Sequence, residues 1–176
     1  MKRLQKGFTI IELLVSISVI AIISGIGFAS FTQFNRKQQV TNTVMMILSD
    51  LRLAQSKAQS SEIPPDTPTP PCETPFCATI CHGNPLVGYK VEFAADNLSY
   101  SIKAVCPPNT PSPIKTVTLP GGIVRVSGFS SVTFKPLQAG IQFVGVNKLV
   151  ISATYDASLT KTINISSGGE INITDN

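Results

Sequence analysis

The chain has 176 residues, which is enough for one modest domain and a short additional segment but leaves no room for a second catalytic domain. Charged residues make up 14% of the chain, whereas an ordinary soluble domain contains about 25%. The deficit is concentrated, because Leu13–Asn35 contains no charged side chain. As a helix this stretch would measure about 35 Å, longer than the roughly 30 Å core of a bilayer, which disfavours a purely cytosolic globular protein.

The net charge of +4 comes largely from the N-terminus. Three of the fourteen basic residues, Lys2, Arg3 and Lys6, lie in the first six positions, and the other Lys and Arg nearly balance the ten acidic residues. Positive charge ahead of an apolar segment stays in the cytoplasm, and the rest of the chain is exported. The charge therefore indicates membrane orientation and gives no reason to expect nucleic-acid binding.

The N-terminus differs from a secretory signal peptide, in which about 7–15 apolar residues precede a small-residue cleavage site. Here the apolar run is longer and no such site follows it. A plain signal anchor is the simplest alternative. Glu12 argues against it, because a carboxylate within a spanning helix costs up to about 3 kcal/mol and marks a functional position with a partner.

The N-terminus contains the run Lys6-Gly7-Phe8-Thr9-Ile10-Ile11-Glu12-Leu13-Leu14-Val15. It resembles the class III leader of type IV prepilins and type II secretion pseudopilins. The resemblance implies that a prepilin peptidase cleaves after Gly7 on the cytoplasmic side and methylates the new amine of Phe8. It also implies a structural filament subunit without enzymatic activity or cofactor, surrounded by membrane lipid before assembly and joined later to other pilin or pseudopilin subunits by an inner-membrane platform protein.

The spacing between Phe8 and Glu12 has a physical reason. Cleavage after Gly7 leaves a cationic amine at Phe8 about one helical turn from the Glu12 carboxylate, with both groups in apolar surroundings. In a bundle of subunits, Glu12 of one chain can pair with the Phe8 amine of a neighbour, and breaking such a buried pair costs about 3–5 kcal/mol. We therefore expect Glu12 to set the register of assembly. An incidental carboxylate that reaches toward the membrane surface is the rival interpretation.

The helix is expected to continue beyond the apolar run. Apolar residues recur at spacings of three and four, as on one face of a 3.6-period helix, at Val40, Val44, Ile47, Leu48, Leu51, Ala54 and Ala58. Most polar residues of this stretch, Asp50 among them, are assigned to the other faces. The pattern predicts one helix from about Phe8 to Gln59, ended by Ile63-Pro64-Pro65. The leader occupies residues 1–7, the transmembrane or filament-core part 8–35, and the amphipathic continuation 36–61.

A Pro/Cys-rich loop is predicted over residues 62–85, which lack any periodicity. The four cysteines, Cys72, Cys77, Cys81 and Cys106, lie in or beside such loops. An even number of cysteines on an oxidising, exported side indicates disulfides. A zinc site using His82 is the rival, but zinc sites favour two short Cys pairs, and Cys106 stands alone.

A hairpin suggests how the cysteines pair. Leu86–Phe93 and Leu98–Val105 alternate in polarity around an Asp96-Asn97 turn. Because the end of the second strand returns to the start of the first, Cys106 would lie near Cys81. Cys72 would then pair with Cys77.

The region from residue 86 to 176 is predicted to form a β-rich globular head. From Thr116 onward, the expected strands are Lys115–Leu119, Ile123–Val126, Val132–Phe134, Ile141–Val144, Leu149–Thr154, Lys161–Ile165 and Glu170–Ile173. The turns between them are expected at Pro120-Gly121-Gly122, Gly128, Ala139-Gly140, Asp156 and Gly168-Gly169. The fold class is therefore α+β, with the long helix packed on an antiparallel β head.

The C-terminal part resembles the H-type minor pseudopilin (GspH/FimT) group. The residues that carry this second resemblance are Leu119-Pro120-Gly121-Gly122-Ile123, Val132–Pro136 with Gly140, Ile163–Ile165, and the ending that begins at Gly168. It implies a minor, tip-associated or priming subunit of a type IV pilus or secretion-type filament.

The same group contains competence pilins that bind DNA through arginines after the C-terminal glycine, and a DNA-uptake function is the alternative. Here Glu170 follows Gly169, and no arginine follows it. Binding of DNA depends on several Lys or Arg that neutralise phosphates. The lysines and the arginine of the head are scattered and matched by acidic residues, so direct DNA binding is not expected.

Overall fold

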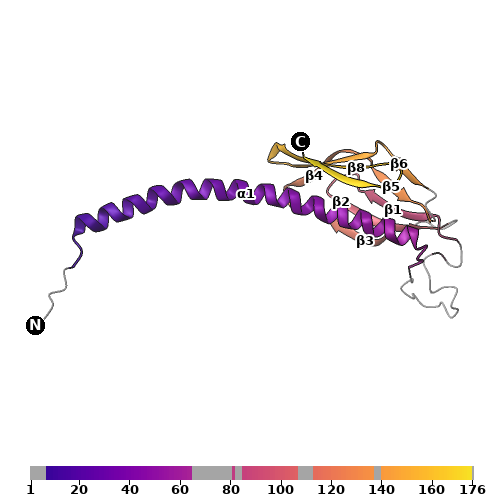
Figure 1. Ribbon diagram of the computed structural model, residues 1–176, viewed down its shortest axis with the longest axis horizontal. Coiled ribbons are helices and arrows are strands. Elements are labelled where there is room, and N and C mark those ends of the chain that lie inside the picture. Colours follow the sequence, from indigo (N-terminus) through magenta and orange to yellow (C-terminus); the bar gives the residue numbers. More distant parts are fainter. Residues whose placement is uncertain (1–6, 65–80, 82–84, 107–112, 137–139, 176) are drawn as a thin grey trace, which may run out of the picture. The chain divides into compact units, whose positions relative to one another are not determined.

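The computed structural model describes residues 7–64, 81, 85–106, 113–136 and 140–175, without the side chains of residues 25–30 and 175. Contacts divide the chain into two compact units, Met1–Gln38 and Gln39–Asn176. Helix α1, Ile10–Gln59, contributes to both units, and every strand belongs to the second (Figure 1). The expected α+β class, a long N-terminal helix followed by antiparallel sheets, is confirmed.

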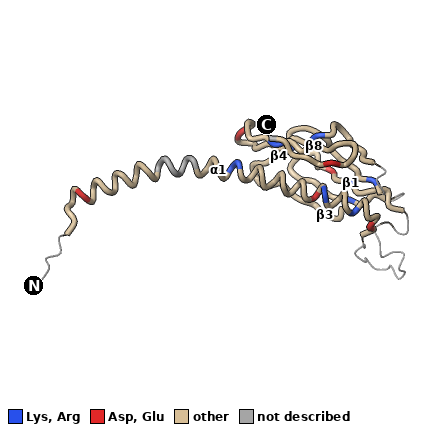
Figure 2. Tube along the Cα trace, viewed as in Figure 1, with Lys and Arg blue, Asp and Glu red and all other residues tan. Residues whose placement is uncertain are grey.

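The first unit consists of the N-terminal part of α1 and the residues before it. The large apolar side chains that are described in this unit are exposed, and tan, uncharged residues occupy most of its helix in Figure 2. Two hydroxyls in this stretch bond to the helix backbone, from Ser16 Oγ to the Glu12 carbonyl at 2.7 Å and from Ser18 Oγ to the Leu14 carbonyl at 2.9 Å. Their hydrogen bonds therefore need no partner outside the helix.

A search of the described residues for a helix with the length and hydropathy of a membrane span found none.

The second unit contains two antiparallel sheets. The first has the order β3-β2-β1-β5-β6, with β1 Gly88–Phe93, β2 Ser99–Val105, β3 Pro113–Thr118, β5 Ser131–Phe134 and β6 Ile141–Val144. The second has the order β4-β7-β8-β9, with β4 Ile123–Gly128, β7 Lys148–Ala153, β8 Asp156–Ile165 and β9 Ile171–Asp175. The expected hairpin is β1 with β2, in a register that pairs Gly88 with Val105 and Phe93 with Tyr100.

The core of the second unit lies between α1 and the inner faces of these sheets. All seven apolar positions expected on one helix face are buried, namely Val40, Val44, Ile47, Leu48, Leu51, Ala54 and Ala58. They join one hydrophobic cluster with side chains of both sheets, such as Tyr89, Val132 and Ile151. The helical period therefore identified the buried face of α1 correctly.

Asp50 is the exception to that pattern. It was assigned to the polar faces of the helix, but only 4% of it is exposed. Its carboxylate accepts a hydrogen bond from the Tyr100 hydroxyl at 2.7 Å and one from Lys115 Nζ at 2.6 Å. A carboxylate can be buried when charged and neutral donors satisfy it, so these two strand residues explain the position of Asp50.

Helix α1 ends through its own backbone and not through the prolines that follow. The Ser61 N–H donates to the Ala58 carbonyl and the Glu62 N–H to the Lys57 carbonyl, both at 3.1 Å, which is a Schellman motif. Ser61 takes the left-handed conformation that this motif requires, with φ of 52°. The helix has therefore already stopped before Ile63-Pro64-Pro65.

The turn expected at Asp156 is wrong, because Asp156 is the first residue of β8. The turn lies at Thr154 and Tyr155, where the Thr154 N–H donates to the Gly122 carbonyl at 2.8 Å. The Asp156 carboxylate accepts bonds from the backbone and hydroxyl of Ser158, at 3.0 and 2.7 Å. The Asp156 side chain thus stabilises the start of β8, and this strand begins five residues before the expected Lys161.

Two contacts anchor the chain on either side of the Pro/Cys-rich loop. The Tyr89 hydroxyl donates to the Glu62 carbonyl at 2.7 Å, and a disulfide joins Cys81 to Cys106, whose Cα atoms are 5.3 Å apart. The disulfide is the pair that the hairpin predicts. Burial, and then the negative charge of Glu62, raise the pKa of Tyr89 to about 12. Residues 65–80 lie outside the described residues.

Candidate processing and assembly site

The Gly7–Phe8 peptide bond lies in a non-helical segment that precedes α1. Gly7 is exposed, and a side chain placed on it would meet nothing within 4 Å. Phe8 is 83% exposed. The two residues that form this peptide bond are therefore accessible from outside the chain. Residues 1–6 of the expected leader lie outside the described residues.

Helix α1 begins at Ile10 and not at Phe8, because Thr9 caps it. Thr9 Oγ1 accepts a hydrogen bond from the Glu12 N–H at 3.3 Å, and the Thr9 carbonyl accepts the first helical bond, from Leu13, at 3.2 Å. Thr9 is thus the N-cap, and Glu12 is the third residue of the first turn. The spacing Thr-x-x-Glu is that of a capping box, a signal that could have identified Thr9 from the sequence.

The position of Glu12, in the first turn of α1, favours a negative charge. The free N–H groups at the start of a helix carry partial positive charge, which stabilises an acidic side chain in the first turn. Among the residues that the structure describes, no basic side chain forms an ion pair with Glu12. The carboxylate therefore keeps the capacity to accept a cation from outside its own chain.

Large apolar side chains surround Glu12 and are open to the exterior in the single chain. Ile11 is 72% exposed, Leu13 56% and Leu14 61%. The same holds further along the helix for Val15, Ile17, Val19, Ile20, Ile22, Ile23, Phe31 and Phe34. An exposed apolar surface of this extent marks a site for lipid or for other proteins.

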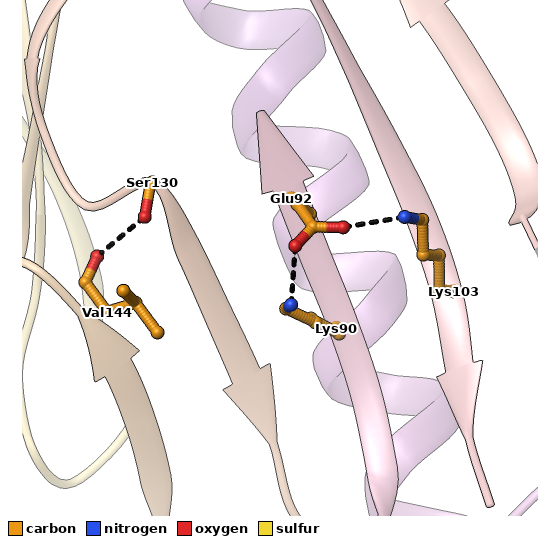
Figure 3. A network of polar contacts seen from close by, with 5 residues as sticks. All are labelled: Lys90, Glu92, Lys103, Ser130 and Val144. Carbon is orange, nitrogen blue, oxygen red and sulfur yellow. Dashed lines mark hydrogen bonds and ion pairs between the residues drawn. The ribbon is translucent and has the colours of Figure 1, made fainter. Parts of the chain in front are cut away.

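Several charged side chains of the head form ion pairs with one another. On the outer face of the first sheet, Glu92 accepts bonds from Lys90 at 2.5 Å and from Lys103 at 2.6 Å (Figure 3). The hydrogen bond from Lys103, and then that from Lys90, hold the pKa of the Glu92 carboxyl below its usual range. Figure 3 also shows the nearby bond from the Ser130 hydroxyl to the Val144 carbonyl, at 3.2 Å.

Two further basic side chains of the head, those of Lys115 and Arg125, also bind groups of the same chain. Lys115 binds Asp50 at 2.6 Å. Arg125 donates to the Asn97 side chain at 2.8 Å and to the Phe129 carbonyl at 3.2 Å, and its guanidinium lies 5.6 Å from the centre of the Phe93 ring. These cations therefore do not form the open basic row that DNA phosphates require.

The remaining candidate residues fall into two groups. Cys81 and Cys106 are joined and buried, whereas Cys72, Cys77 and His82 lie outside the described residues. Within the ranges that are described, no group of three His, Cys, Asp or Glu side chains is arranged to hold a metal ion. Gly7, Phe8 and Glu12 lie together at the start of α1, and the disulfide lies in the second unit.

Comparison with protein families identifies the N-terminal segment. Residues 2–28 match the model of the prokaryotic N-terminal methylation motif. The chain carries a prepilin-type leader. The match covers the N-terminal segment alone, and a motif of this kind is typical of type IV pilin-like prepilins. Comparisons of the chain with curated proteins and with solved structures gave no match.

Proposed function

We infer that the chain is a minor pilin or pseudopilin, a structural subunit of a type IV pilus or of a type II secretion-type filament. The observation that carries this conclusion is the combination of the methylation motif over residues 2–28 with Glu12 in the first turn of an exposed apolar helix. The finer assignment to the H-type (GspH/FimT) group rests on the C-terminal pattern, in which Phe134 ends β5 and Gly169 precedes β9.

Before assembly, the subunit is held in the cytoplasmic membrane by a single pass with its head exported. The proposal is supported by the basic residues Lys2, Arg3 and Lys6 ahead of the apolar run, which keep the N-terminus in the cytoplasm. The exposed apolar side chains from Ile10 to Ile23 supply the surface that lipid would cover. An oxidising exterior would suit the Cys81–Cys106 disulfide.

Cleavage after Gly7 converts this membrane protein into an assembly-competent subunit. The peptidase removes the cationic leader and leaves a methylated amine on Phe8. The platform protein then moves the subunit into the filament, where lipid around the helix is replaced by helices of neighbouring subunits. In that apolar bundle Glu12 pairs with the Phe8 amine of a neighbour, because neither charge is stable alone there.

Mass analysis of the membrane-extracted protein tests the processing step. We expect the loss of residues 1–7 and one added methyl group on Phe8. A chain that retains Met1 and its lysines, in cells with an active prepilin peptidase, would contradict the proposal. The Gly7→Ala and Phe8→Ala variants test separately whether the peptidase recognises each of these two residues. Each should slow removal of the leader without changing the fold of the head.

The Glu12→Gln variant tests the assembly step. It keeps the size of the side chain and removes its charge, so cleavage should proceed while incorporation into filaments falls more than about tenfold. Glu170→Gln, which removes an exposed carboxylate of the head, is the matched control and should incorporate normally. Normal incorporation of Glu12→Gln would overturn the assigned role.

A further inference from the structure

A pocket of about 310 Å³ opens in the second unit where the end of α1 meets two turns. It is lined by Gln55 and Gln59 of α1, by Lys135 after β5, and by Ser167 and Gly169 before β9, among others. None of its lining residues belongs to the candidate processing and assembly site.

The walls of the pocket are preorganised by contacts within the head. Gln55 Nε2 donates to the Gly169 carbonyl at 2.8 Å, and the Lys135 N–H donates to the Gly140 carbonyl at 3.1 Å. Gly169 has φ of 91°, and a side chain on it would approach Gln55 Nε2 to 2.7 Å. The left-handed φ favours glycine at this position, and a side chain there would displace the Gln55 amide from its bond to the Gly169 carbonyl.

The lining favours an anion. Among the described residues that line the pocket, Lys135 is the single charged one and none is acidic. Across the described part of the chain, no carboxylate forms an ion pair with Lys135, unlike Lys90, Lys103 and Lys115. The other polar side chains, those of Gln55, Gln59 and Ser167, are neutral groups that can donate hydrogen bonds.

The same lining distinguishes a single carboxylate from a polyanion. Nucleic acid binds through several cations that neutralise successive phosphates, and this pocket provides one ammonium. One ammonium with neighbouring amide and hydroxyl donors suits one carboxylate, which accepts several hydrogen bonds through two oxygens.

We propose that this pocket receives the side-chain carboxylate of an Asp or Glu on the head of a neighbouring filament subunit. The proposal rests on the proposed function, since it needs heads held side by side. It gives the heads a contact separate from the Glu12 pairing of the helices. Selection among subunits would follow, because a neighbour without an acidic residue at the matching position leaves Lys135 unpaired.

Titration of the processed full-length chain in detergent micelles with sodium acetate tests the pocket directly. The side-chain amide signals of Gln55 and Gln59 should shift in a saturable manner, and sodium chloride at equal ionic strength should not reproduce the shift. Lys135→Gln should weaken acetate binding about tenfold, the effect of one charge-assisted hydrogen bond. Lys148→Gln, which alters an exposed lysine at the start of β7, should leave it unchanged. Equal shifts with chloride, or an unchanged response of Lys135→Gln, would overturn the proposal.

Incorporation into filaments supplies the second readout. Lys135→Glu should reduce incorporation of the processed subunit, and Lys148→Glu should not. Equal incorporation of both variants would overturn the pocket and leave the proposed function intact. Failure of the unaltered chain to incorporate would overturn both. A 20-base-pair DNA duplex is the third arm, and binding of it that is lost in Lys135→Gln would assign the pocket to a nucleic-acid phosphate instead.

Discussion

Helix α1 has two halves in opposite environments, although it is one continuous element. In the second unit Val44, Ile47 and Leu51 are completely buried against the sheets. In the first unit Ile10 is 87% exposed, and Ile22 and Ile23 are 66% and 65% exposed. The second unit therefore satisfies its apolar surface within the chain. The first unit leaves its large apolar side chains open to other molecules, and this is the physical difference between a self-contained head and a helix that needs a partner.

The largest expected effect on the free energy of unfolding comes from a substitution in the buried half of α1. Leu51→Ala should lower the free energy of unfolding by about 2–5 kcal/mol, because it removes a fully buried side chain and leaves a cavity. Leu14→Ala, at a position 61% exposed, should change it by less than about 0.5 kcal/mol. Urea unfolding of the full chain in detergent, followed by the near-ultraviolet circular dichroism of the buried Tyr89 and Tyr100, measures both. Similar losses in the two variants would contradict the comparison.

The next largest effect on stability concerns the Cys81–Cys106 disulfide, a covalent link within the second unit. Replacing Cys81 and Cys106 together by serine should lower the stability of the head by about 2–4 kcal/mol, since the disulfide closes a loop with a sequence separation of 25 residues. Chemical reduction of the unaltered chain should give at least a similar loss, and reduction should affect the double variant less, because only the expected Cys72–Cys77 pair is left in it to reduce. A midpoint that is independent of reductant in the unaltered chain would argue that this bond contributes nothing to the head.

The third prediction concerns Ser61, which follows the C-terminal end of α1. Ser61 holds a left-handed conformation that costs a side-chain-bearing residue roughly 1 kcal/mol, while glycine adopts it freely. Ser61→Gly should therefore raise the free energy of unfolding by a few tenths of a kcal/mol up to about 1 kcal/mol, after the larger entropy loss of glycine is included. Ser61→Ala is the control and should give no gain. Denaturant midpoints with unchanged slopes provide the measurement.

The smallest effect concerns Glu92. Its pKa is lowered in the folded state by Lys103 and Lys90, so its contribution is present at pH values above its unfolded pKa and is lost as the pH falls through the folded pKa. Because the pair is partly exposed, Glu92→Gln should cost less than about 1 kcal/mol at neutral pH. The difference from the unaltered chain should shrink below about pH 4.3. A gap that stays constant down to acidic pH would show that packing, and not charge, is responsible.

Much of the fold follows from periodicity. Seven apolar positions with a helical period identified the buried face of α1, and alternation around Asp96-Asn97 identified the β1–β2 hairpin and with it the Cys81–Cys106 pair. These features are local or depend on neighbouring strands. The motif around Gly7 and Glu12 was visible for the same reason, since all its residues lie within two helical turns.

The features that the sequence did not reveal depend on distant partners. Asp50 looks like an ordinary polar residue until Tyr100 and Lys115 are placed beside it by a sheet formed many residues later. Asp156 has turn chemistry, yet the pairing of β8 with β7 and its own bonds to Ser158 make it a strand residue. The pocket beside Lys135 combines a helix end with two turns, which no local pattern encodes.

The two anchors near the ends of the Pro/Cys-rich loop are of different chemical kinds. The Tyr89 hydroxyl holds the chain at Glu62 through a hydrogen bond, and the Cys81–Cys106 bond holds it again at Cys81. Both anchors connect to the β1–β2 hairpin, the first at Tyr89 in β1 and the second at Cys106 directly after β2. A thiol reductant would therefore release the second anchor and leave the first in place, so only one of the two depends on the redox state of the surroundings.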